Sequence, residues 1–204
     1  PPVGLDRFRP ARGPRDYYLL AGAMAPYKRG ELAIEACARL KRRLVVAGTG
    51  QQQAALQKIA GPQVEFIGGW ISDQQMAQLY AGARALLFPG EEDFGIMPVE
   101  AMASGCPVIA FGAGGALETV GRDAGPEALA ALARGEATTV PGGVLFAQQS
   151  VESLVDAIEH LERGHFEPAA LAARALPFSG EAFDRQFRAA FDRHFAAFRA
   201  SRGA

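Results

Sequence analysis

The feature that most constrains the fold is a regular alternation between short apolar runs and longer segments with helical periodicity. Each apolar run has the length of a buried strand, and each following segment has the length of a helix. Strands that alternate with helices predict a parallel sheet whose crossover helices cover its faces. We therefore expect an α/β fold with a Rossmann-like, doubly wound parallel sheet of about six strands. The expected strands are residues 17–22, 44–48, 64–68, 85–89, 107–111 and 143–146.

Helices are expected between these strands, and polar residues mark where two of them begin. Ser72 or Asp73 is expected to cap one helix, and Ser150 is expected to cap the helix that follows the last strand. Residues 121–142 are rich in glycine and alanine and break the alternation, so we expect an inserted loop with a short helix there. The expected helices are residues 30–40, 51–60, 73–83, 98–104 and 150–163.

The last part of the chain, residues 177–204, carries a stripe of phenylalanines at helical spacing. Such a stripe predicts an amphipathic helix with one apolar face. We expect this helix to pack on the main domain, residues 17–176; the alternative is that it grips a further domain. The phenylalanines are Phe183, Phe187, Phe191, Phe195 and Phe198.

Length, composition and charge exclude several classes of protein. With 204 residues and 49% hydrophobic residues, the chain can bury a sizeable core. The formal net charge of -1 argues against a nucleic acid partner, because nucleic acid binding requires a broad basic face. The apolar runs are too short to span a membrane. Two cysteines, Cys37 and Cys106, fit a reducing compartment, so the cytoplasm is the expected location. The chain opens on two prolines, and we expect it to be a piece of a longer protein.

The segment EEDFGIMPVE, residues 91–100, places acidic residues around an expected helix start. Pro98 disfavours helical geometry at Met97, so the helix should begin near residue 98, with Glu100 in its first turn. Glu92 would then lie on the loop that leads into the helix, and the amides between the two acids would be free. Gly105 is expected to end the helix.

A helix N-terminus suits a phosphate, whereas neighbouring acids suit hydroxyl groups. A nucleotide-diphosphate sugar satisfies both, because its diphosphate can meet the amides while its ribose and hexose hydroxyls meet the carboxylates. The loop also follows the carboxyl end of a strand, where open α/β sheets bind ligands. The alternative is that Glu100 only complements the helix dipole and that Glu92 is a solvated loop residue.

The sequence from Glu92 to Glu100, continued as AMASGCPVIA, resembles the donor-site motif of the retaining family 4 glycosyltransferases with the GT-B fold. The resemblance covers about residues 1–165 and is confined to the C-terminal, donor-binding half of that family. It implies that residues 1–16 are an interdomain segment and that the N-terminal, acceptor-binding half is absent. The supporting segments are AGAMAPYKRGELAIEACARL at 21–40, LVVAGTG at 44–50, VEFIGGWISDQQMAQLYAGARALLFP at 64–89, FGAGGALETV at 111–120 and GVLF at 143–146.

The resemblance implies a role for individual residues. Glu100 would bind the ribose hydroxyls, Glu92 would hold the transferred sugar, and Lys28 would neutralise the departing diphosphate. The implied catalytic residues are Glu92 and Lys28. The implied donor-binding residues are Gly22, Lys28, Arg29, Ile67, Gly68, Phe94, Gly95, Ile96, Met97 and Glu100.

This sequence departs from the family pattern at one position. Family members often carry an arginine five residues before this lysine, where this chain has Ala23. We therefore expect Arg29, or a residue of the absent half, to share the phosphate charge. Ile67 and Gly68, with Trp70 close by, would line the base pocket.

The resemblance also implies the chemistry. Transfer with retention is ascribed in this family to front-face attack, with no enzyme nucleophile, metal or cofactor. The segment resembles most the members that use GDP-mannose in surface polysaccharide assembly, with UDP-sugars as other candidate donors. The acceptor would be a glycan or a lipid-linked sugar. The protein would be cytoplasmic, and the absent half could bind it peripherally to the inner membrane face. This chain alone would be inactive.

Other functions remain as alternatives. The chain could be a stand-alone nucleotide-sugar binding module, or half of a sugar-nucleotide epimerase, without transferase activity. A coding region extending upstream by a domain would favour the transferase. Glycine loops at residues 48–53 and 112–117 begin like a dinucleotide fingerprint but lack its last glycine, which argues against a nicotinamide enzyme.

Overall fold

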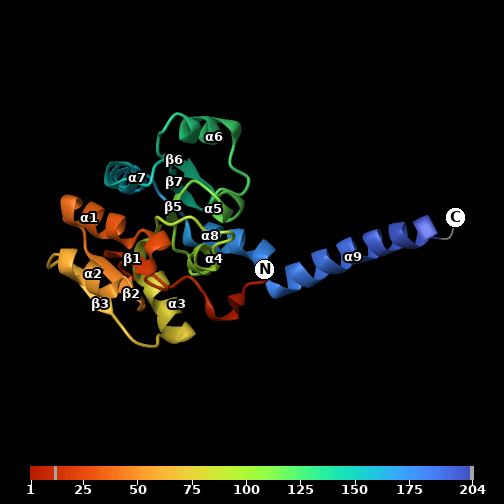
Figure 1. Ribbon diagram of the computed structural model, residues 1–204, viewed down its shortest axis with the longest axis horizontal. Coiled ribbons are helices and arrows are strands. Elements are labelled where there is room, and N and C mark those ends of the chain that lie inside the picture. The colour runs from red at the N-terminus through yellow and green to blue at the C-terminus, as the bar shows by residue number, and fades with distance from the viewer. Residues whose placement is uncertain (12, 203–204) are drawn as a thin grey trace.

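The computed structural model describes residues 1–11 and 13–202 and shows a single mixed sheet between two layers of helices (Figure 1). The sheet has seven strands in the order β3-β2-β1-β4-β5-β7-β6. All neighbouring strands are parallel except β6 and β7. The strands are β1 Tyr17–Ala21, β2 Leu44–Ala47, β3 Val64–Ile67, β4 Ala83–Phe88, β5 Val108–Phe111, β6 Thr138–Val140 and β7 Gly143–Phe146.

The helices follow the strands as the sequence predicts, so the expected doubly wound α/β fold is confirmed. Ser72 caps α3 by accepting a hydrogen bond from the Gln75 amide, and Ser150 caps α7 in the same way. The helices are α1 Gly30–Leu40, α2 Gln53–Ile59, α3 Asp73–Gly82, α4 Ile96–Ala103, α5 Gly115–Thr119, α6 Pro126–Ala133, α7 Val151–Arg163, α8 Pro168–Ala175 and α9 Gly180–Arg202.

The core forms on both faces of the sheet, because the central strands are buried on both sides. Helices α1, α2 and α7 cover one face, where Ile34, Leu56 and Leu154 pack against the strands. Helices α3, α4 and α8 cover the other face, where Tyr80 and Met102 are buried. Burial on both faces explains why these strands appear in the sequence as continuous apolar runs rather than alternating ones.

The order of the strands creates a crevice at one edge of the sheet. From β1 the chain moves outward to β2 and β3, then returns to place β4 on the other side of β1. The loops that leave the carboxyl ends of β1 and β4 therefore run in opposite directions. Such a reversal point is where doubly wound sheets bind ligands.

The inserted region at residues 121–142 differs in part from the prediction. The expected short helix is present as α6, but residues 138–140 form β6, a strand that pairs antiparallel with β7. The prediction of a loop without a strand was therefore wrong there, and β6 is a seventh strand beside the about six expected. β6 is a run of three β-branched residues, Thr138 to Val140, and the Pro141-Gly142 turn joins it to β7.

Helix α4 begins earlier than predicted. It starts at Ile96, so Pro98 is its third residue and Glu100 lies in the second turn, not the first. The prediction failed because the first amides of a helix have no partner within the helix. A proline at the third position therefore sacrifices no hydrogen bond, and the restriction on Met97 is overcome.

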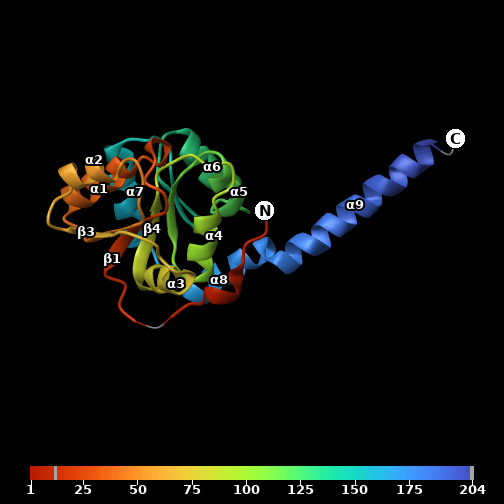
Figure 2. The same cartoon turned by 60° about the horizontal axis from the view of Figure 1, so that its bottom comes forward.

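Helix α9 is present, but the prediction that it packs on the domain was wrong. It leaves the domain and extends away from it (Figures 1 and 2). Its phenylalanines are exposed, from 39% at Phe183 to 59% at Phe187, whereas Ala182 in its first turn is buried. The alternative role, a grip on a further domain, stays a prediction. Within the described residues, none of the helices, α9 included, is both long and apolar enough to cross a membrane.

Because α9 touches the domain only at its start, its removal should leave the stability of the domain almost unchanged. We expect truncation after Phe183 to change the free energy of unfolding by less than about 1 kcal/mol in urea denaturation. Leu154→Ala, which empties a fully buried site on α7, should lower it by about 2–5 kcal/mol. A large loss on truncation would contradict the observed separation of α9.

Candidate functional site

Two neighbouring hollows lie at the carboxyl edge of the sheet, around the reversal point. The first hollow has a volume of about 510 Å³, and the second hollow has a volume of about 380 Å³. Met97, in the first turn of α4, lines both, so the hollows meet at this side chain. The first hollow is lined by Pro1, Tyr27, Lys28, Glu91, Glu92, Asp93, Phe94, Gly95, Ile96 and Met97. The second hollow is lined by Gly22, Ala23, Ala47, Gly48, Thr49, Gly69, Trp70, Ile71, Met76, Tyr80, Met97 and Glu100.

An ion pair between Lys28 and Glu92 forms one wall of the first hollow. Lys28 ends a short 3-10 helix between β1 and α1, and Glu92 lies on the loop after β4. The Lys28 ammonium also lies 5.5 Å from the ring centroid of Tyr27 and 5.8 Å from that of Phe88. Both members of the pair are mostly buried, with 14% and 20% of their side chains exposed. The pair is therefore shielded from solvent, and its cation faces the ligand space.

The N-terminus of α4 opens into the first hollow. Gly95 is the N-cap, with φ of 88°, a left-handed conformation that favours glycine. Among the described residues, no side chain caps this helix start. Its amides and the positive end of its dipole are therefore available to an anion.

The glycine loop at residues 112–115 supports the segment that carries Glu92. The Gly115 amide donates a hydrogen bond to the Glu92 carbonyl at 2.7 Å. A Cβ atom on Gly115 would lie 2.3 Å from the Cα atom of Phe94, which is closer than any side chain tolerates. Glycine is required here because two backbone segments touch.

The floor of the second hollow is backbone. Gly22 follows β1 and Gly48 follows β2, each with positive φ. A Cβ atom on Gly48 would lie 2.2 Å from the Gly22 carbonyl oxygen, and one on Gly22 would lie 2.8 Å from the Met97 sulfur. These glycines keep the carboxyl ends of the two strands close and leave room for Met97.

Glu100 is the acidic residue of the second hollow. Its carboxylate accepts a hydrogen bond from the Tyr80 hydroxyl at 3.2 Å. Burial raises the pKa of Glu100, and the hydrogen bond from Tyr80 opposes that rise. Burial also raises the pKa of Tyr80 well above its usual value, so the phenol remains a proton donor.

The structure brings together most, but not all, of the residues expected at the site. Glu92 and Glu100 face separate hollows that meet at Met97, rather than one shared cavity. The residues expected at the site that do line a hollow are Gly22, Lys28, Glu92, Phe94, Gly95, Ile96, Met97 and Glu100.

Three expected residues line neither hollow. The Arg29 side chain forms an ion pair with Glu31, with its Nε 2.6 Å from the carboxylate, and does not line either hollow. Ile67 and Gly68 do not line the second hollow, whereas the two residues that follow them, Gly69 and Trp70, do. Trp70 is 87% exposed in the described chain.

No pattern in the sequence identified Thr49, Met76 or Tyr80 as part of the site. Tyr80 lies on α3 and meets Glu100 on α4, a pairing that depends on how the two helices pack. Within residues 1–11 and 13–202, no group of three or more His, Cys, Asp or Glu side chains is arranged to hold a metal ion.

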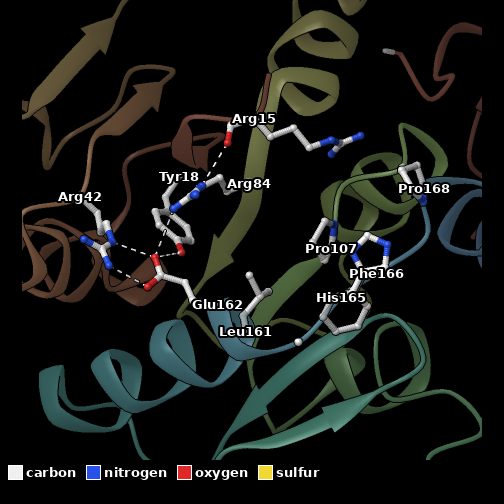
Figure 3. A pocket seen from close by; sticks show the side chains of 12 residues that line it. Arg15, Tyr18, Arg42, Arg84, Pro107, Leu161, Glu162, His165, Phe166 and Pro168 are labelled. Carbon is white, nitrogen blue, oxygen red and sulfur yellow. Dashed lines mark hydrogen bonds and ion pairs between the residues drawn. The ribbon is translucent and has the colours of Figure 1, made fainter. Parts of the chain in front are cut away.

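A third hollow, of about 540 Å³, lies at the opposite edge of the sheet, near the amino ends of the strands (Figure 3). Its polar wall is centred on Glu162 of α7, which accepts hydrogen bonds from Tyr18 at 2.9 Å and from Arg42 at 2.7 and 2.8 Å. The pKa of Glu162 is lowered chiefly by the bond from Arg42. Arg84 also pairs with Glu162, at 3.4 Å, so the network ties α7 to β1 and β4, and it lies far from the reversal point.

The family model described as "Glycosyl transferases group 1" matches residues 15–163. The chain belongs to this family. Helix α4, the glycine loop and the second hollow lie within the matched residues, as does the first hollow apart from Pro1. Membership favours a glycosyltransferase over half of a sugar-nucleotide epimerase.

Relatives and solved structures agree with this assignment. The chain is 32% identical to the D-inositol 3-phosphate glycosyltransferase of Streptomyces scabiei, over 56% of this chain and 33% of the relative. It is 34% identical to a GDP-mannose-dependent alpha-(1-6)-phosphatidylinositol dimannoside mannosyltransferase of Mycobacterium tuberculosis, over 55% and 33%. The chain thus spans about a third of these relatives' length.

Two solved structures share the fold. The sucrose-phosphate synthase of Thermosynechococcus elongatus superposes with a TM-score of 0.72 and 25% identity, covering 96% of this chain and 52% of the synthase. HepE of Anabaena, solved in complex with UDP and glucose, superposes with a TM-score of 0.71 and 18% identity, covering 94% and 55%. The expected C-terminal half of a GT-B enzyme is therefore confirmed at the level of fold and family.

The contact between Gly115 and Phe94 predicts that the glycine loop controls the shape of the first hollow. Gly115→Ala should displace the segment around Glu92 and weaken binding of nucleotide sugars by at least about tenfold in calorimetric titration, with little change in overall fold by circular dichroism. Gly4→Ala is the control, since a Cβ atom there meets nothing within 4 Å. Equal affinity of the two variants would contradict the proposed support.

Proposed function

We propose that this chain is the donor-binding half of a retaining glycosyltransferase that transfers a hexose from a nucleotide-diphosphate sugar. The observation that carries the proposal is the uncapped N-terminus of α4, which lies between the Lys28–Glu92 pair and Glu100. An anion-binding helix end between two acidic side chains fits a ligand whose charged centre joins two hydroxyl-rich groups.

Each of the two hollows would hold a different part of the nucleotide sugar. The diphosphate would lie at the helix start beside Met97, where the hollows meet. The ribose would lie in the second hollow against Glu100, and the sugar would lie in the first hollow against Glu92. The base would then extend toward Trp70, whose exposed ring offers a surface for stacking.

Lys28 can serve both the sugar and the leaving group. An ammonium has three donors, so it can keep its contact with Glu92 and still contact a phosphate oxygen. Lys28 is the one cationic side chain that lines either hollow in the described part of the chain. Ala23 lines the second hollow and Arg29 is paired with Glu31, so we propose that a further phosphate-binding cation comes from a part of the protein outside this chain.

The proposed chemistry needs stabilisation of negative charge as the sugar leaves. Charge builds up on the diphosphate when the glycosidic bond breaks, and the α4 amides and Lys28 are fixed in place to meet it. Fixed donors are effective because they need no reorganisation during the reaction. The acceptor would be held by the absent half and would approach the face of the sugar from which the diphosphate leaves. This chain alone would therefore bind the donor without transferring its sugar.

GDP-mannose is the donor we propose first, and UDP-sugars are the second choice. The mycobacterial relative is named as GDP-mannose-dependent, and the Anabaena structure contains UDP and glucose. Three glycines, Gly22, Gly48 and Gly69, line the second hollow, and contacts of a base with the backbone there would offer little selection between the two bases. We propose a glycan or lipid-linked acceptor and a cytoplasmic location, with any membrane contact made through the absent half.

Calorimetric titration with GDP-mannose, UDP-glucose and UDP-N-acetylglucosamine tests the proposal. At least one should bind saturably. Lys28→Ala should reduce the affinity for that ligand by about 10–100-fold, which corresponds to the loss of a charged hydrogen bond worth roughly 1.5–3 kcal/mol. Glu92→Ala should reduce the preference for the sugar nucleotide over its free diphosphate, whereas Glu100→Ala should weaken both ligands.

Lys58→Ala is the matched control, because Lys58 is exposed on α2 and lines neither hollow. It should bind like the wild-type chain. Absence of saturable binding to all three ligands, or equal losses in the two lysine variants, would contradict the proposed donor site.

A further inference from the structure

Tyr80 places a buried hydroxyl against the carboxylate that lines the second hollow. Tyr80 is 1% exposed, and its hydroxyl donates to Oε2 of Glu100 at 3.2 Å. Its ring is held in the core and contacts Phe8 edge to face, with centroids 6.0 Å apart. The donor is therefore fixed, and the acceptor, which starts from the second turn of α4, is the more exposed partner.

A purely structural role would be met more simply by a neutral acceptor. Tyr17 of β1 is an example, because its hydroxyl donates to the carbonyl of Leu79, on the same helix as Tyr80, at 2.7 Å. Burying a carboxylate disfavours its charged form, and the raised pKa of Glu100 reflects that cost. A carboxylate kept at such a cost, at the edge of a hollow, suggests a ligand that needs it.

We propose that Tyr80 is a positioning residue that orients the Glu100 carboxylate to receive the two ribose hydroxyls of the donor. The inference rests on the proposed function, because it assigns a partner to the residue that would bind ribose. Tyr80 itself would not contact the reacting atoms.

The geometry suits this division of work. Tyr80 occupies one lone pair of Oε2, which leaves Oε1 and the remaining lone pairs for two hydroxyl donors. Two hydroxyls on adjacent ribose carbons need an acceptor with a fixed plane. Without Tyr80, the Glu100 side chain would have to be ordered by the ligand itself, and that ordering would reduce affinity.

The test compares ribose with dideoxyribose. GDP and UDP, and the 2′,3′-dideoxy form of each, are titrated into the wild-type chain and into Tyr80→Phe. The wild-type chain should bind a ribose form at least about tenfold more tightly than its dideoxy form. Tyr80→Phe should reduce this preference to about threefold or less while leaving the dideoxy affinity unchanged.

Two further variants separate positioning from folding. Tyr17→Phe removes a hydroxyl that contacts the same helix but not the hollow, and it should keep the full preference for ribose. In a Glu100→Ala background, Tyr80→Phe should cause no further loss of ribose preference, because the two residues act as one unit.

The outcomes distinguish the inference from the proposed function. If the wild-type chain binds neither GDP nor UDP, the proposed function is wrong and the inference falls with it. If the wild-type chain prefers ribose and Tyr80→Phe keeps that preference in full, the inference alone is overturned. A loss of dideoxy affinity as large as the loss of ribose affinity would also overturn it, because it would indicate general damage to the site.

Discussion

The open N-terminus of α4, placed at the reversal point of the sheet, is the constraint on which the rest of the site depends. The turn from β4 into α4 aims unpaired amides into the space between the loops after β1 and β4. Lys28 reaches this space from the loop after β1, and Glu92 reaches it from the loop after β4. The parallel sheet thus brings together residues that are far apart in the sequence. The helix dipole adds a partial positive charge at the point where they meet.

Close backbone contacts maintain this arrangement at least as much as side chains do. Gly48 lies so close to Gly22, and Gly115 so close to Phe94, that a Cβ atom added to either glycine would clash with the neighbouring backbone. Backbone packing fixes positions more firmly than flexible side chains, which suits a site whose proposed task is electrostatic stabilisation by preorganised donors. The ion pairs around Glu162, at the opposite edge, provide a contrast, since there side-chain charges pair with one another and hold elements together.

Six of the seven strands and most helices were predicted from the sequence, because burial on both faces leaves a continuous apolar run that has few alternatives. Three of the features that escaped prediction did so for physical reasons. β6 is only three residues long, and Pro98 sits at a helix position where its missing amide does not matter. The stripe on α9 identifies an apolar face but not what covers it. At the site, motif residues near Gly95 were predictable, whereas the contact between Tyr80 and Glu100 depends on packing between two helices and has no local pattern.

The role of the α4 N-terminus can be measured by amide chemical-shift mapping in NMR, with GDP-mannose or UDP-glucose added to the chain. We expect saturable shifts at the amides of Gly95, Ile96 and Met97, because these groups would meet the diphosphate, and no comparable shifts around Glu162 at the opposite edge. Saturable binding that leaves the three α4 amides unshifted would contradict the claim that this helix start is the centre of the site.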